Sequence, residues 1–231
     1  MKITVTAVRR VVQVAAAVLL SAVATFPSRA QTSGDDTPSL NQTTGKISPF
    51  AVEKDNEFGV WGGSSYDSPT LIGGTRNSKL AGVVGVRYGR VFVARSWVAV
   101  EYTIDLVPVA VVSRPVASST TGGSAPTSRS FVYGAGVAPV GFKFIFRRQD
   151  RINPFIGINS GPFYFSQPVP RPDATRFNFL SHFNAGLQVF TRPDRAITIG
   201  YDISHLSNAG VSRINPGMNA NYFYVGLSIF R

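Results

Sequence analysis

The sequence contains no cysteine, which excludes disulfide bridges, zinc ribbons and thiol catalysis together. It also carries little charge: 15% of its 231 residues are Asp, Glu, Lys or Arg, against about 25% in an ordinary soluble domain. Disordered chains are rich in charge and poor in apolar residues, so a chain that is 44% hydrophobic is not one of them. Ala, Glu, Lys and Leu do not dominate the composition, which excludes a coiled coil.

Long apolar runs are also missing. After the first thirty residues no apolar stretch reaches about 18 residues, so no membrane-spanning helix is expected there. Positive charge is in excess, with 23 Lys and Arg against 12 Asp and Glu, but the arginines are scattered singly along the chain. Proteins that bind nucleic acid gather their basic residues into patches, so a nucleic-acid partner is not expected. The length predicts a single domain.

The first thirty residues are typical of a cleaved signal peptide. Basic residues at 2–10 precede an apolar run of 16 residues at 11–26, and Ser28-Arg29-Ala30 forms a small-x-small cleavage site. An N-terminal membrane anchor is the alternative, although the run is short for a spanning helix. We therefore expect an exported protein. Its predicted parts are a signal peptide at 1–30, a flexible N-terminal segment at 31–55 and a folded domain at 56–231.

From residue 56 onward, apolar and polar residues alternate with a period of two, which indicates β-strands. The connections between them alternate between short and long, as the turns and loops of outer-membrane barrels do. The predicted fold is all-β, an eight-stranded antiparallel transmembrane β-barrel of the bacterial outer membrane. The expected strands are 56–65, 80–92, 97–112, 130–147, 152–166, 177–191, 195–207 and 221–231.

The polar face of these strands distinguishes a barrel from a soluble sandwich. A sandwich would show the same alternation, but its solvated face would carry dense Lys and Glu. Here that face holds Gly, small residues and isolated charges, which suits a narrow barrel interior filled by side chains and ion pairs. The apolar face is then the lipid face. The charges expected in the interior are Arg87, Glu101, Asp105, Lys143 and Asp202.

His205 and Ser207 are two residues apart on the strand expected at 195–207, so they share one face. A hydroxyl within reach of an imidazole nitrogen is the first requirement for an activated serine. Their parity is that of the apolar face, so both should point outward, near a long connection. The alternative is that they lie in the headgroup region, where polar side chains cost little. His182 has the opposite parity and is expected to be hydrogen-bonded inside, so no metal site is expected.

The stretch His205-Leu206-Ser207-Asn208-Ala209-Gly210, followed by Asn215-Pro216-Gly217, resembles the signature of the PagL family of lipid A 3-O-deacylases. The resemblance implies an outer-membrane barrel that hydrolyses the 3-linked acyl ester of lipid A as a serine esterase, without a cofactor. It implies Ser207 as the nucleophile and His205 as its base. The groups proposed to stabilise the oxyanion correspond to Asn208, Gly210 and Asn215. The implied partner is lipopolysaccharide, and the sequence leaves both a monomer and a homodimer open.

One position departs from the family's pattern. The family has an acid two residues after the Pro-Gly pair, where this sequence has Asn219. In a serine protease, converting the orienting carboxylate to an amide lowers turnover about 10⁴-fold, although papain-like enzymes orient their histidine with asparagine. Asn219→Glu is therefore expected to raise turnover, by up to several powers of ten if Asn219 holds the wrong histidine tautomer and by little if Asn219 already orients His205 well. A catalytically impaired or non-enzymatic barrel, with a structural or lipopolysaccharide-binding role, is the alternative function. A small structural barrel without lipid-modifying ancestry is a third, and the motif at 205–217 argues against it.

Overall fold

The computed structural model describes residues 55–231, except 70–72, 76, 117–127 and 149. The expected signal peptide at 1–30, and all of the expected flexible segment except Asp55, lie outside the described residues. In the described ranges no helix is long and apolar enough to cross a membrane.

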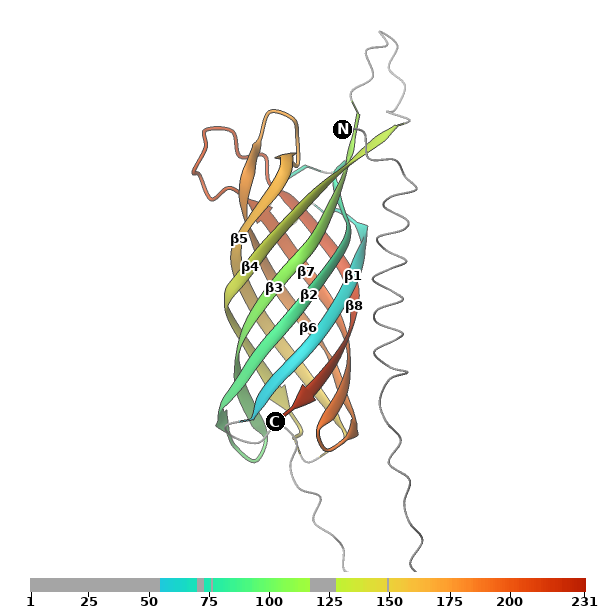
Figure 1. The fold of residues 1–231 in the computed structure, drawn as a ribbon, viewed down its shortest axis with the longest axis vertical. Coiled ribbons are helices and arrows are strands. Elements are labelled where there is room, and N and C mark those ends of the chain that lie inside the picture. The colour runs from blue at the N-terminus through green and yellow to red at the C-terminus, as the bar shows by residue number, and fades with distance from the viewer. Residues whose placement is uncertain (1–54, 70–72, 76, 117–127, 149) are drawn as a thin grey trace, which may run out of the picture. The chain divides into compact units, whose positions relative to one another are not determined.

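Eight antiparallel strands close into one barrel (Figure 1). Each strand pairs with its neighbours in the chain, and β1 pairs with β8, from Glu57 opposite Phe230 to Ser65 opposite Tyr222. The predicted fold class and the number of strands are confirmed. The strands are β1 (Asn56–Asp67), β2 (Lys79–Ala94), β3 (Val98–Pro115), β4 (Arg129–Phe146), β5 (Ile152–Val169), β6 (Thr175–Arg192), β7 (Arg195–Ser207) and β8 (Met218–Phe230).

The last strand begins earlier than the sequence predicts. Residues 208–220 were expected to form one long connection, but β8 starts at Met218. The backbone reason is that Met218, Asn219 and Ala220 continue the pairing with the end of β7, opposite Leu206, His205 and Ser204. This difference brings Asn219 from a loop into the barrel wall.

The outer wall is apolar along its whole circumference. Soluble monomers rarely expose large apolar patches, whereas a barrel that crosses a membrane presents an apolar band to lipid. Here every strand carries large hydrophobic side chains that face outward and are exposed. Examples from β1 to β8 in order are Phe58, Val86, Leu106, Phe142, Ile158, Phe183, Ile199 and Phe223.

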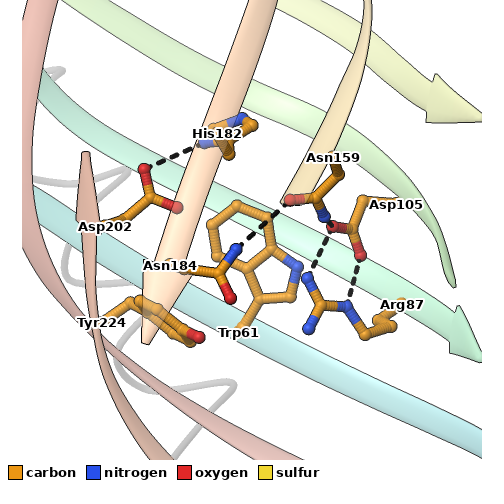
Figure 2. Close-up of a pocket in the computed structure, with 8 residues that line it drawn as sticks. All are labelled: Trp61, Arg87, Asp105, Asn159, His182, Asn184, Asp202 and Tyr224. Carbon is orange, nitrogen blue, oxygen red and sulfur yellow. Dashed lines mark hydrogen bonds and ion pairs between the residues drawn. The ribbon is translucent and has the colours of Figure 1, made fainter. Parts of the chain in front are cut away.

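Inside the barrel, a hydrogen-bonded polar network lies among buried apolar and aromatic side chains such as Trp61 and Tyr224 (Figure 2). Arg87 donates from Nε and Nη2 to the two carboxylate oxygens of Asp105, at 2.8 and 2.7 Å. His182 Nδ1 lies 3.1 Å from Asp202 Oδ1. Lys143 Nζ lies 2.9 Å from Glu101 Oε2. All five charges that the sequence assigns to the interior are therefore found there, and each is paired.

Gly161 on β5 lies against an irregularity of β4, where the β4–β5 register shifts between Gly136 and Val140. A Cβ atom at Gly161 would be 2.0 Å from the carbonyl oxygen of Val137, and backbone cannot move aside as a side chain can. We expect Gly161→Ala to lower the free energy of unfolding by about 1–3 kcal/mol. Urea unfolding in detergent micelles, followed by tryptophan fluorescence, measures this change.

Gly82→Ala is the matched control, because a Cβ there meets no described atom within 4 Å. Its free energy of unfolding should stay within about 0.5–1 kcal/mol of the wild-type value. Equal unfolding midpoints for Gly161→Ala and Gly82→Ala would show that the backbone of β4 can shift to make room for a Cβ atom at residue 161.

Candidate active site

The strand β7 ends at Ser207, where the long β7–β8 connection begins (Figure 1). Near this end, the side chains of His205 and Ser207 lie on the outer wall. The alternation along β7 produces this placement. Ser204 and Leu206 are buried inside the barrel, whereas His205 and Ser207 are only partly buried and share the face of Ile199. The outward direction predicted from parity is therefore seen in the structure.

Asn219 is the direct cross-strand partner of His205. The distance from His205 Nδ1 to Asn219 Oδ1 is 2.7 Å, which is a short hydrogen bond. Asn219 is almost completely buried, with 1% of its surface exposed. Asn219, at the position where the resemblance implies an acid, is thus in contact with the imidazole of His205.

The other end of the Asn219 side chain contacts the connection between β1 and β2. Asn219 Nδ2 donates to the carbonyl oxygen of Pro69 at 2.9 Å and also to the carbonyl oxygen of Gly73. Ser68 Oγ donates to the backbone oxygen of Asn219 at 2.7 Å. The sequence gives no signal for these contacts, since all three acceptors are backbone oxygens.

The three candidate oxyanion residues are bonded mainly to one another and to their own loop. Asn208 N donates to Asn215 Oδ1 at 3.0 Å, and Gly210 N donates to Asn208 Oδ1 at 2.9 Å. Asn208 Nδ2 donates to the carbonyl oxygen of Ile214 at 2.9 Å. The backbone N–H groups of Asn208 and Gly210 therefore both already have acceptors within the loop. Asn215 is exposed, and its Nδ2 makes no hydrogen bond within the described part of the chain.

Ser207 Oγ makes no hydrogen bond to any described residue, so its hydroxyl is not engaged elsewhere. Its cross-strand partner on β6 is Phe179. Catalytic hydrogen bonds are commonly longer or poorly aligned in free enzymes and tighten only with substrate. The arrangement therefore brings a free hydroxyl, an imidazole and an orienting amide to one patch of the outer wall.

A second serine lies beside His205 that sequence reasoning missed. Ser181 on β6 is the cross-strand partner of His205, and its Oγ is 2.8 Å from Ser160 Oγ on β5. Its outward parity is readable from the sequence, because it precedes the inward His182. Its position opposite His205 depends on the β6–β7 register, which the sequence does not specify.

The second histidine of the chain, His182, pairs with a carboxylate, that of Asp202, and this pair lies in the lumen (Figure 2). Tyr222 Oη is 3.0 Å from His182 Nδ1, so the imidazole belongs to the interior network. Asp202 therefore faces away from His205 and cannot supply the missing acid. Among the described residues, no three His, Asp or Glu side chains converge as metal ligands would.

Comparison with known proteins identifies a family. A family model described as "Lipid A 3-O-deacylase (PagL)" matches residues 85–228. Among solved structures, the outer membrane enzyme PagL is 17% identical, with a TM-score of 0.47 over 74% of this chain and 97% of that chain. The outer membrane protein OprG from Pseudomonas aeruginosa is 7% identical, with a TM-score of 0.46 over 79% of this chain and 98% of that chain.

The comparison with curated protein sequences gives no match. The family model, however, covers more than half of the sequence, including all of β7, with His205 and Ser207, and β8 from its start through Asn219 to residue 228. This protein belongs to the PagL family of lipid A 3-O-deacylases.

Proposed function

We propose that this protein is an active lipid A 3-O-deacylase of the bacterial outer membrane, which hydrolyses the 3-linked acyl ester as a serine esterase. The observation that carries the proposal is the 2.7 Å contact between His205 Nδ1 and Asn219 Oδ1, beside Ser207 on the lipid-facing wall. Because Nδ1 gives its hydrogen to Asn219, His205 Nε2 keeps its lone pair. A neutral imidazole with a free Nε2 is what a serine nucleophile needs as its base.

The reaction proceeds in two steps. His205 Nε2 accepts the proton of Ser207 as Oγ attacks the ester carbonyl carbon, and the tetrahedral intermediate breaks its bond to the sugar oxygen. The imidazolium returns the proton to that oxygen, which leaves as the sugar hydroxyl. Water then hydrolyses the acyl-serine in the same way, releasing the fatty acid and restoring Ser207.

Charge on the carbonyl oxygen needs a donor during both steps. Asn215 Nδ2 is the donor we assign, since its amide oxygen is fixed by Asn208 N and its NH₂ group is uncommitted. Asn208 and Gly210 support this group by holding the loop in shape. A direct role for the Gly210 N–H would require its bond to Asn208 Oδ1 to break.

The apolar outer wall supports the proposed location in the membrane. An ester of lipid A lies at the boundary between headgroups and acyl chains, and the catalytic residues lie where β7 meets its long connection. We further propose that residues 1–30 direct export and are removed, and that 56–231 form the mature barrel.

Purified protein in detergent, incubated with lipid A that carries a 3-linked acyl chain, tests the proposal. Mass spectrometry should show loss of that one chain, and the loss should persist in a metal chelator because no metal takes part in the mechanism. Binding of lipid A without any loss of mass would instead indicate the non-enzymatic, lipopolysaccharide-binding alternative.

A further inference from the structure

The amide of Asn219 fits its surroundings in only one orientation. Nδ2 faces two carbonyl oxygens, those of Pro69 and Gly73, while Oδ1 faces His205 Nδ1. The reverse orientation would place oxygen against two oxygens and leave the NH₂ group without these acceptors. Buried polar groups left without partners are costly, so the environment determines which atom meets the histidine.

We infer that the β1–β2 connection sets the tautomer of His205 through Asn219, and that this site is built for a neutral amide instead of a carboxylate. The catalytic meaning of the inference rests on the proposed function. Two backbone carbonyls hold the Nδ2 group of Asn219, so the Oδ1 atom of Asn219 faces His205. Because Oδ1 can only accept, His205 Nδ1 must carry the hydrogen. His205 Nε2 is then left without a hydrogen and can act as the base. Pro69 and Gly73 thereby act as positioning residues.

The backbone around Asn219 is fixed by the same connection. Ser68 Oγ donates to the Asn219 backbone oxygen at 2.7 Å. Thr75 donates to the carbonyl oxygen of Gly217 twice, from N at 3.1 Å and from Oγ1 at 3.2 Å. With the two bonds from Asn219 Nδ2, these contacts attach the β1–β2 connection to Gly217, just before β8, and to Asn219, the second residue of β8. We call this set of contacts, made by Ser68, Pro69, Gly73 and Thr75, the amide clamp.

Gly217 links the amide clamp to the imidazole itself. Its φ of +61° is in the left-handed region that favours glycine. A Cβ on this residue would lie 3.3 Å from His205 Cε1, so the backbone of the Pro216-Gly217 turn packs directly on the ring. The histidine is therefore confined by the turn as well as by Asn219.

Every residue of the amide clamp precedes residue 85, where the match to the family model begins. The clamp thus comes from a part of the chain that the family match does not cover, and it contacts the position where this chain departs from the family's acid. The contacts of the amide clamp explain how an asparagine is accommodated at this position. They also reverse the expectation that Asn219→Glu raises turnover, because a carboxylate has no hydrogen to give the two carbonyls.

The isosteric variant Asn219→Asp is the sharpest test of the amide. It keeps an oxygen for His205 but places a charged oxygen against the carbonyls of Pro69 and Gly73. We expect turnover on lipid A to fall about tenfold or more, and the longer Asn219→Glu to fall at least as far. Turnover above the wild-type level in either variant would overturn the inference, since it would show that the site lacks an acid.

A direct measurement of the tautomer does not depend on activity. The chain has only two histidines, so a protein labelled with ¹⁵N-histidine in micelles gives two sets of ring signals, and His205→Gln identifies which set belongs to His205. We expect wild-type His205 to be protonated at Nδ1 and free at Nε2. The variants Asn219→Ala and Ser68→Ala/Thr75→Val should shift population toward the Nε2-protonated form.

Ser64→Ala is the matched control, because it removes a similar serine-to-carbonyl bond, to Ala81, outside the amide clamp. Its tautomer and turnover should match those of the wild type. Wild-type His205 protonated at Nε2 would overturn the inference even if Asn219→Asp failed to fold. If wild-type protein shows the Nδ1-protonated form but releases no acyl chain, the inference about the tautomer stands and the proposed function fails.

Discussion

Ser207→Ala is expected to abolish release of the 3-linked acyl chain from lipid A. The substitution removes the hydroxyl that attacks the ester and leaves the barrel wall otherwise unchanged, because Ser207 Oγ has no hydrogen bond to lose among the described residues. Loss of a triad nucleophile lowers turnover by about 10⁴-fold or more in serine proteases. Mass spectrometry of lipid A after incubation with equal amounts of folded protein measures the effect.

His205→Ala should reduce release of the acyl chain almost as far as Ser207→Ala does. The double variant Ser207→Ala/His205→Ala should be no less active than either single variant. Members of a catalytic unit lose their effect together, so their losses do not add. Additive losses would indicate that Ser207 and His205 act in separate steps.

Ser181→Ala is the matched control for Ser207→Ala. Both serines face outward next to His205, Ser181 across the strand pair and Ser207 along the strand. Only Ser181 is engaged by another hydroxyl, that of Ser160 at 2.8 Å. We therefore expect Ser181→Ala to retain most of the activity. The opposite result, with activity lost in Ser181→Ala and kept in Ser207→Ala, would identify the cross-strand serine as the nucleophile.

The parts of the fold that follow from side-chain alternation could be predicted from the sequence. A period of two assigns each residue to one of two faces, and this was enough to place His205 and Ser207 outside and Asp202 inside. The lengths of the connections were enough to predict antiparallel closure. Glu57 was missed as an interior charge, because the small residues at 62–65 interrupt the apolar alternation of β1.

The contacts that complete the site could not be predicted in the same way. Asn219 follows a Pro-Gly turn and has no apolar run around it, so its strand character depends on its pairing with His205. Pro69 and Gly73 contribute backbone oxygens, which every residue has, so no residue type marks them. These contacts depend on register and on loop packing, and neither leaves a periodic pattern in a single sequence.

A different prediction concerns the stability of the barrel interior, where one cation serves two carboxylates. Lys143 Nζ forms ion pairs with Glu57 and with Glu101, the latter at 2.9 Å, and all three side chains are at most 3% exposed. Glu57 also accepts hydrogen bonds from Ser228 and, at 3.4 Å, from Gln188. The cluster joins β1, β3 and β4 inside the barrel. Lys143 is therefore the residue whose loss leaves the most uncompensated charge.

Lys143→Met keeps an unbranched side chain one atom shorter than lysine and removes the charge, leaving two buried carboxylates next to each other. Breaking a buried ion pair from one side costs about 3–5 kcal/mol, because the remaining charge has no partner. We expect the free energy of unfolding in micelles to fall by about this amount, measured by urea titration.

Glu101→Gln is the control, since it retains the pair between Lys143 and Glu57 and removes the surplus carboxylate. Its free energy of unfolding should change by no more than about 1 kcal/mol. Equal losses in the two variants would mean that the cluster is stabilised by hydrogen bonds to its neighbours, and that charge balance contributes little.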